Sequence, residues 1–392
     1  CAHRRVNEIA ADLPFSGPQA TLAELETLSP PGRDRAQYLL DRGLLKTYVG
    51  DTVGARADLE EAKQIMAALQ AVSITENLAA ATTNETLRSY SGTPSDQALV
   101  HFMLALNYLF EGDLDGARVE MLQADVKMQE LADGYSVSGQ MASVRFLAGF
   151  VYELNGEFDD ALISYRRAYR IMKERFETIP EALQISLLNL SRRQGFDEEY
   201  ADYTAEFGRE HDLPSADELE WVLIYHEGVV SDKIENRFPI FDPGLNTMVT
   251  VVVPAYPPNA YYPIGLSLED AEAYRNTAVL ENLERRARED LQSEMPGILA
   301  AATVRAAGKY TMMKSAQDNN DFAIMIAAIA AFASEQADLR SWNMLPSSIQ
   351  VARLKVARDQ RIVIPQRGFT SPPAGELAVG SAVLVFTTSL SN

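Results

Sequence analysis

Cysteine is almost absent from this chain. Its 392 residues contain a single one, Cys1, so no disulfide can form within the chain. A thiolate zinc site and a redox-active thiol pair both need more than one cysteine, and both are excluded for the same reason. The fold must therefore be stabilised by packing and by polar contacts rather than by covalent cross-links.

Long apolar runs are also absent. Spanning a bilayer as a helix takes roughly 20 consecutive, predominantly apolar residues, and no stretch of the sequence approaches that length. The longest candidate is Phe322–Ala333, which is apolar on nearly every helical face. It predicts either a buried core helix or a helix that contacts another subunit or the membrane interface.

Positive charge is scarce. The chain carries 35 Lys and Arg against 55 Asp and Glu, a net charge of −20. Such a surface repels phosphate backbones, so nucleic acid is excluded as a partner. The apolar content of 47% is that of an ordinary globular protein, large enough to bury two or three cores.

Signatures of catalysis and metal binding are missing as well. The four histidines, His3, His101, His211 and His226, form no HExxH pair, and the sequence has no GxSxG elbow, Walker loop or EF-hand loop. We therefore expect no enzymatic activity, no cofactor and no metal. An enzyme acting on glycans or peptides through carboxylates such as Glu227 and Asp232 is kept as an alternative.

What the sequence does contain is a repeated local pattern around three turn glycines, Gly50, Gly112 and Gly156, each followed by an acidic residue. A small residue lies seven positions before each glycine, an alanine five after it, a larger apolar residue nine after it and a second alanine twelve after it. These residues are Gly43, Ala55, Leu59 and Ala62; Ala105, Ala117, Met121 and Ala124; and Gly149, Ala161, Tyr165 and Ala168, with Tyr108 and Tyr152 shortly before the second and third turns. This is the pattern of tetratricopeptide (TPR) repeats, in which small residues lie where two antiparallel helices touch. A generic helical bundle is the alternative.

The pattern divides the chain into three parts. Residues 1–30 contain several prolines and little periodicity, and they predict a tether, although Val6, Ile9 and Leu13 have helical spacing. Residues 31–212 predict a TPR-like α-solenoid, with a degenerate fourth turn at Gly195 that is typical of a capping unit. Such a solenoid forms a concave groove suited to a peptide or a partner helix.

Residues 213–392 predict a small β-sheet domain with inserted helices. Strands are expected at Trp221–Tyr225, Met248–Val253, Ile349–Ala357, Gln360–Ile364 and Ala382–Thr388. Between them, a helical region from Ser267 to Ala337 is expected to break near Pro296 and Asp318. The whole chain is then α+β and mainly α.

The order of these segments resembles a family of bacterial lipoproteins with TPR repeats. The residues that carry the resemblance are Glu220–Gly228, Val252–Tyr256, Met295–Arg305 and an Arg-x-Trp-x-x-Leu-Pro element formed by Arg340, Trp342, Leu345 and Pro346. Such proteins are often encoded beside a lipoprotein similar to activators of penicillin-binding proteins. The resemblance implies an envelope assembly with lipoprotein partners and no enzymatic reaction. Trp342 and Pro346 also have a structural explanation, as a buried anchor and a helix stop.

Cys1 completes this interpretation. A chain that starts at its sole cysteine resembles a mature bacterial lipoprotein whose Cys1 carries acyl chains, and Ala2 suggests the outer membrane. We expect a non-enzymatic, lipid-anchored scaffold that binds other envelope proteins or lipoproteins, in a homo- or hetero-oligomer, on the periplasmic face more readily than the cell surface. The alternative is a regulator of a peptidoglycan synthase or hydrolase.

Overall fold

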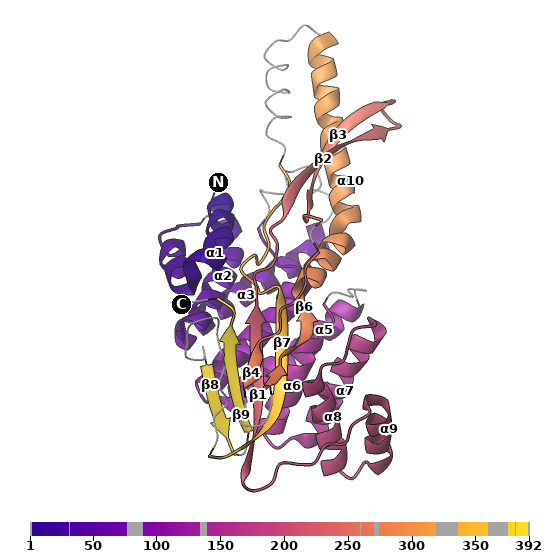
Figure 1. Cartoon of the computed structure of the whole chain (residues 1–392). Helices are drawn as coiled ribbons and strands as arrows, with labels where there is room; N and C mark the ends of the chain where they lie inside the picture. The colour runs from indigo at the N-terminus through magenta and orange to yellow at the C-terminus, as the bar shows by residue number, and fades with distance from the viewer. Residues whose placement is uncertain are drawn as a thin grey trace.

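The computed structural model describes residues 2–30, 32–76, 89–133, 139–258, 260–269, 274–318, 336–359, 375–380 and 382–390. Three predictions concern residues outside these ranges: the acyl site Cys1, the apolar helix Phe322–Ala333 and the strand Gln360–Ile364. The prediction of a mainly helical α+β fold with TPR-like hairpins is confirmed (Figure 1).

Four helical hairpins follow one another along the N-terminal half. Their helices are α2 (Arg35–Tyr48) and α3 (Thr52–Glu76), α4 (Pro94–Phe110) and α5 (Leu114–Asp133), α6 (Ala142–Leu154) and α7 (Phe158–Glu174), and α8 (Glu181–Arg193) and α9 (Asp197–Phe207). Each hairpin turns at one of the four glycines, which have φ between 73° and 84°. Only glycine adopts this backbone conformation without strain, which is why the turn pattern was visible in the sequence.

Small side chains bring the two helices of a hairpin together. Seven alanines of the repeat pattern have no exposed surface: Ala55, Ala62, Ala105, Ala117, Ala124, Ala161 and Ala168. A Cβ atom at Gly149 would lie 2.7 Å from the ring of Tyr165, and one at Gly43 would lie 2.7 Å from Leu59. Tyr152 and Tyr165 are buried, while Tyr108 is half-buried beneath the guanidinium of Arg56. The fixed spacing in the sequence therefore reflects direct contact of Gly43 and Gly149, in the first helix of a hairpin, with the large apolar residue of the second helix.

The N-terminal segment is not a tether. Helix α1 (Ala2–Leu25) is kinked at Gly17 and packs against α2. Val6, Ile9 and Leu13 are at most 1% exposed, so they form the buried face of a packed helix, as their helical spacing indicates. Pro14 and Pro18 lie inside α1 at the kink, where the chain is bent anyway.

A five-stranded sheet follows, in the order β6-β7-β1-β9-β8. Its strands are β1 (Glu218–Glu227), β6 (Ala278–Asn282), β7 (Ser348–Ala357), β8 (Gly375–Val379) and β9 (Ala382–Thr388). β1 pairs antiparallel with β7 and parallel with β9, so strands from distant parts of the sequence lie side by side. Side chains alternate between the two faces, and the apolar residues of both faces are buried.

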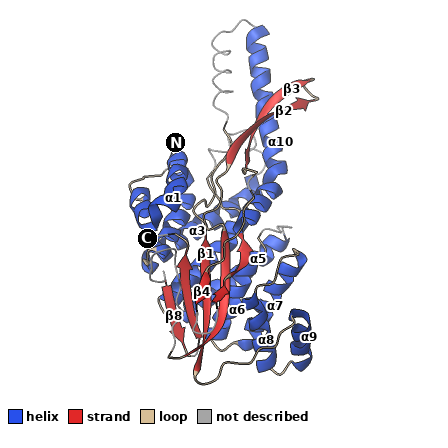
Figure 2. Ribbon diagram, viewed as in Figure 1, coloured by secondary structure: helices blue, strands red, loops and turns tan. Residues whose placement is uncertain are grey.

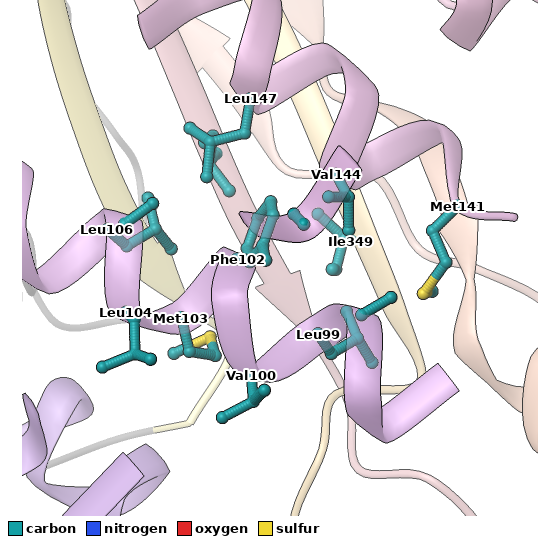
Figure 3. Packing of buried hydrophobic residues seen from close by; sticks show 14 of the residues in the cluster. Leu99, Val100, Phe102, Met103, Leu104, Leu106, Met141, Val144, Leu147 and Ile349 are labelled. Atoms are coloured by element: carbon teal, nitrogen blue, oxygen red, sulfur yellow. The ribbon is translucent and has the colours of Figure 1, made fainter. Parts of the chain in front are cut away.

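The helices and the sheet share one hydrophobic core. Figure 3 shows Leu99, Phe102 and Val144 of α4 and α6 packed together with Ile349 of β7. The same cluster extends from Val6 in α1 to Phe386 in β9. The repeat segment and the sheet segment are thus packed as one body, instead of each burying a core of its own as we expected.

An arm projects from this body. It consists of α10 (Leu283–Asp318) and the hairpin of β2 (Ile234–Asp242) and β3 (Thr247–Ala255), which stand away from the sheet in Figures 1 and 2. Val249, Val251 and Val253 pack on Ala302 and Ala306 of α10. Within the described residues, the arm consists of one long helix and the hairpin packed on it.

The helical region predicted from Ser267 is wrong at its start and at its first break. Strands β4 (Ser267–Glu269), β5 (Tyr274–Asn276) and β6 occupy the segment before Leu283. α10 then continues through Pro296, which removes one backbone donor but does not end a helix of this length. Leu268 of the β4–β5 hairpin belongs to the apolar cluster on the outer face of the sheet.

Candidate interaction surfaces

The concave side of the repeats is filled by the protein's own sheet. The first helix of each hairpin contacts the sheet, which lies against the helices in Figure 2. α4 packs on β8, α6 on β6 and α8 on β7, while Tyr48 of α2 reaches His226 of β1. The sheet therefore occupies the surface that we expected to receive a peptide or a partner helix. An external ligand could use that groove only by displacing five strands.

An ionic network fixes the sheet to the third and fourth hairpins. Arg353 of β7 is 2% exposed and donates to Glu153 at 2.6 Å and 3.0 Å and to Glu220 at 2.7 Å. Ser186 and Asn189 of α8 complete the network through Arg353 and Glu220. The two carboxylates raise the pKa of Arg353 despite its burial, so it stays charged. The network joins helix to sheet, and only Glu153 is partly exposed to solvent.

His226 of β1 lies at the same interface between helices and sheet, where the sheet meets the first hairpin. Its Nδ1 lies 3.0 Å from the hydroxyl of Tyr48, and its ring meets Phe386 edge-on at 4.8 Å between centroids. Burial lowers the pKa of His226 to about 3, so the folded state holds a neutral imidazole. This is a histidine packed in a core, and no acid-base partner faces it among the described residues.

His226 should make stability depend on pH. The unfolded chain binds a proton at this residue below its ordinary pKa of about 6.5, and the folded chain binds one only near 3, so stability should fall as pH drops between these values. The slope should approach about 1.4 kcal/mol per pH unit within that window. Urea unfolding at several pH values should show a shallower slope for His226→Leu. Tyr48→Phe keeps the imidazole and should keep the wild-type slope; a His226→Leu slope equal to the wild-type slope would contradict the assignment.

Four polar side chains of the second and third hairpins, those of His101, Asn107, Arg145 and Asn155, are used within the fold and do not line an open groove. His101 is buried against Glu120 at 2.7 Å, and Asn107 donates to Thr47 and to the carbonyl of Met103. Arg145 is buried and pairs with Asp125. The last of the four, Asn155, donates to the carbonyl of Val151 in the preceding turn.

The Arg-x-Trp-x-x-Leu-Pro element joins the N-terminal helices to the sheet. Trp342 is 1% exposed, and Leu345 and Pro346 are buried beside it. Arg340 donates to Asp338 at 2.6 Å and, at 3.1 Å, to Asp34 and to the carbonyl of Arg33. The element therefore has an architectural role, since each of its side chains is used in packing.

A cavity beside Trp342 is far too small for a substrate. It measures about 20 Å³, the volume of a single water molecule, and it is lined by Asp96, Tyr256, Asp290 and Trp342 among others. Glu227 accepts hydrogen bonds from Tyr261 and Ser348, and Asp232 accepts one from Asn343, so both carboxylates already have partners. Within the described ranges no group of three or more His, Cys, Asp or Glu side chains could hold a metal ion.

The outward face of the repeats carries an apolar stripe on α5. Val119, Leu122 and Val126 are 48%, 44% and 60% exposed, and their spacing places them along one face of the helix. Phe176 in the turn after α7 is 97% exposed and has φ of 57°, a conformation that costs a non-glycine residue roughly 1–2 kcal/mol. Each of these four apolar side chains thus leaves 44% or more of its surface in contact with solvent.

The arm carries a second apolar patch near the tip of its hairpin. Phe241 and Met248 are direct cross-strand partners and are 56% and 54% exposed. On α10, Val304 is 52% and Met312 is 40% exposed. We did not predict β2 from the sequence, because Glu235, Arg237 and Pro239 interrupt its apolar alternation. This arm is the main feature of the structure that the sequence did not reveal.

Comparisons with known proteins identify no family for this chain. No protein-family model matches the chain, and neither does any curated protein. The apo form of RapI is 11% identical with a TM-score of 0.37, over 48% of this chain and 47% of RapI. MamA of AMB-1 is 14% identical with a TM-score of 0.34, over 53% of this chain and 90% of MamA. The chain thus spans about half the length of RapI, and similarity at this level supports no inference about ligands or partners.

No described helix is both long enough and apolar enough to cross a bilayer. The candidate interaction surfaces are the stripe on α5 and the arm, each of which exposes apolar side chains to solvent.

Proposed function

We propose that this chain is a non-enzymatic scaffold that binds other proteins of the bacterial envelope through its outward surfaces. One observation carries the proposal: the groove of the repeats is filled by the chain's own sheet, while an arm with exposed apolar side chains projects from the body. Partner proteins would then bind to the arm and to the stripe on α5. A regulator of a peptidoglycan synthase or hydrolase that acts through the groove would first have to displace the sheet.

Site-specific photo-crosslinking in intact cells tests this proposal. A photoreactive amino acid at Phe241 in the arm or at Leu122 in α5 should yield adducts of defined mass. The matched control is Glu198, which is also exposed but lies at the start of α9, away from both surfaces. Adducts at Glu198 as frequent as those at Phe241 and Leu122, or none at any position, would contradict the proposal.

Acylation of Cys1 and an outer-membrane location are part of this proposal. Because α1 is packed from Val6 onward, acyl chains on Cys1 would hold the folded body at the membrane surface instead of at the end of a long tether. Cys1→Ser protein should then move from the membrane fraction to the soluble fraction of the envelope. Continued sedimentation of Cys1→Ser with membranes would contradict acylation as the anchor.

A further inference from the structure

A cluster of buried oxygen atoms lies where α1 and α2 meet the Arg-x-Trp-x-x-Leu-Pro element. Three of these oxygens have no hydrogen-bond partner among the described residues: Oε1 of Gln37, Oδ2 of Asp41 and Oδ1 of Asn343. All three residues are at most 1% exposed. Each of the three atoms is an acceptor, and a buried acceptor without a partner is destabilising. The cluster therefore needs either a donor or a cation.

Hydrogen bonds hold these side chains beside one another. Gln37 and Asp41 lie about one turn apart on the same face of α2. The backbone N–H of Met344 donates to Oδ1 of Asp41 at 3.3 Å, which brings the preceding residue, Asn343, to the same place. The amides of Asn343 and Gln37 both donate to Oδ1 of Asn7, at 3.2 Å and 3.4 Å. Each of these two amides thus uses its nitrogen within the cluster and leaves its oxygen over.

The orientation of the amides is fixed by a backbone contact. Nδ2 of Asn7 donates to the carbonyl of Leu339 at 3.4 Å, so Oδ1 of Asn7 is the atom that accepts from the other two amides. Turning the amide of Gln37 or Asn343 around would place two oxygens against each other. The unpartnered oxygens therefore cannot be exchanged for the nitrogens of the same amides.

The acidic groups of the cluster lack a counter-cation among the described residues. The charges that act on Asp41 belong to two other carboxylates, Asp96 and Asp232. Burial raises the pKa of Asp41 well above its usual range, and these two like charges add to the rise. Asp232 accepts a hydrogen bond from Asn343 at 3.1 Å, and burial raises its pKa too. Buried carboxylates are normally paired with a cation or bound to a metal ion.

We propose that one calcium ion binds here, to four oxygen-bearing side chains: those of Gln37, Asp41, Asp232 and Asn343. Calcium takes roughly six to eight oxygen ligands, including carboxylate and amide oxygens, at about 2.3–2.6 Å. Asp232 is only half-buried, so water can reach the ion and supply the remaining ligands. Only two of the four side chains are carboxylates. The site thus differs from a group of three or more His, Cys, Asp or Glu side chains, of which the described ranges hold none.

Charge and ligand type favour calcium over other cations. Two carboxylates carry two negative charges, which a divalent ion neutralises and a sodium ion does not. Magnesium requires near-ideal octahedral geometry and retains several waters, which does not suit four side chains from three separate segments. Zinc and other transition metals favour nitrogen and sulfur ligands, and none of the four side chains is histidine or cysteine.

The ion would join parts of the chain that are far apart in the sequence. Gln37 and Asp41 belong to α2, and Asn343 lies within the Arg-x-Trp-x-x-Leu-Pro element. Asp232 lies two residues before β2, the first strand of the arm. Calcium would therefore fix the base of the arm to the first hairpin. This inference goes beyond the proposed function and holds whichever protein the arm binds.

Thermal unfolding of the full chain after treatment with EDTA tests the proposal. About 5 mM CaCl2 should raise the unfolding midpoint by roughly 2–4 °C, because an ion that binds only the folded state stabilises it. The same concentration of MgCl2 should have a much smaller effect. Asp232→Asn removes one ligand charge at a half-buried position, where the fold tolerates the change, and should lose most of the calcium shift.

A matched control separates this site from calcium held loosely by the acidic surface. Asp115→Asn makes the same change of charge at an exposed position of α5 and should keep the wild-type shift. A wild-type midpoint that does not respond to calcium overturns the proposal. Equal calcium shifts for Asp232→Asn and Asp115→Asn overturn it as well.

Terbium luminescence locates the ion without substituting a ligand. Tb³⁺ replaces calcium in oxygen sites, and its emission rises when an excited tryptophan close by transfers energy to it. Trp342 directly precedes Asn343, so excitation of tryptophan should produce terbium emission that excess calcium abolishes. Trp342→Phe should lose most of this emission. Trp221→Phe, in β1 on the opposite face of the sheet, should keep it, and equal emission from the two variants overturns the location.

Discussion

Replacing Arg353 by methionine should destabilise the protein by about 3–5 kcal/mol, because it leaves buried carboxylates without their cation. Glu153 and Glu220 both receive hydrogen bonds from the Arg353 guanidinium, and Glu220 is 6% exposed. Among the described residues, Arg353 is the only Lys or Arg that forms an ion pair with either carboxylate, so without it at least one of them must take up a proton or draw in water. Equilibrium unfolding in urea, followed by circular dichroism, measures the loss.

The control is an arginine of similar geometry at the surface. Arg166 in α7 binds Glu199 through two nitrogens, but its side chain is 35% exposed and that of Glu199 is 26% exposed. Solvent screens this pair, so Arg166→Met should cost at most about 1 kcal/mol. If Arg353→Met cost no more than Arg166→Met, the buried network would not be what holds the sheet against the helices.

A second variant distinguishes the loss of the attraction between Arg353 and its carboxylates from the cost of leaving those carboxylates charged and unpaired. Neutralising all three groups together, as Arg353→Met with Glu153→Gln and Glu220→Gln, removes the uncompensated carboxylates as well as the cation. The triple variant should be more stable than Arg353→Met alone, because a buried ion pair often contributes little beyond what an uncharged packing would give. If the triple variant lost as much free energy of unfolding as the three single substitutions lose in total, the network would be strongly stabilising by itself.

The sequence predicted those parts of the fold that depend on local geometry. Gly149 is needed because Tyr165 lies against it, and Gly156 is needed because the turn has positive φ, so both constraints appear at fixed spacing in the chain. The position of the sheet in the groove could not be predicted in the same way. It depends on contacts such as Tyr48 with His226 and Arg353 with Glu153, whose partners are far apart in the sequence and follow no spacing rule.

The misassigned segments have a common physical cause. Pro14 and Pro296 were each interpreted as signals against regular structure, yet they lie inside α1 and α10. In each case the loss of one backbone donor is small beside what the segment gains by burying apolar side chains, such as Leu13 in α1. Tertiary packing outweighed local preference, and without the tertiary structure the size of that packing contribution was unknown.

Trp342→Ala should cost about 3–5 kcal/mol, the other large loss that we expect. Trp342 is the largest fully buried side chain, and it lies in the core that joins the N-terminal helices to the sheet. Leu99 of α4 and Leu283 of α10 line the adjoining cavity with it, so truncation would enlarge a cavity shared by three parts of the chain.

The second tryptophan of the chain provides the matched control. Trp221 lies one residue before Val222 in β1, on the opposite face of the sheet, where it is only partly buried. Trp221→Ala should therefore cost less than half as much as Trp342→Ala. Because the chain has two tryptophans, the fluorescence of each single variant reports on the other, while circular dichroism follows global unfolding. Equal losses for the two variants would show that Trp342 is an ordinary core residue, and the Arg-x-Trp-x-x-Leu-Pro element would then need an explanation other than architecture.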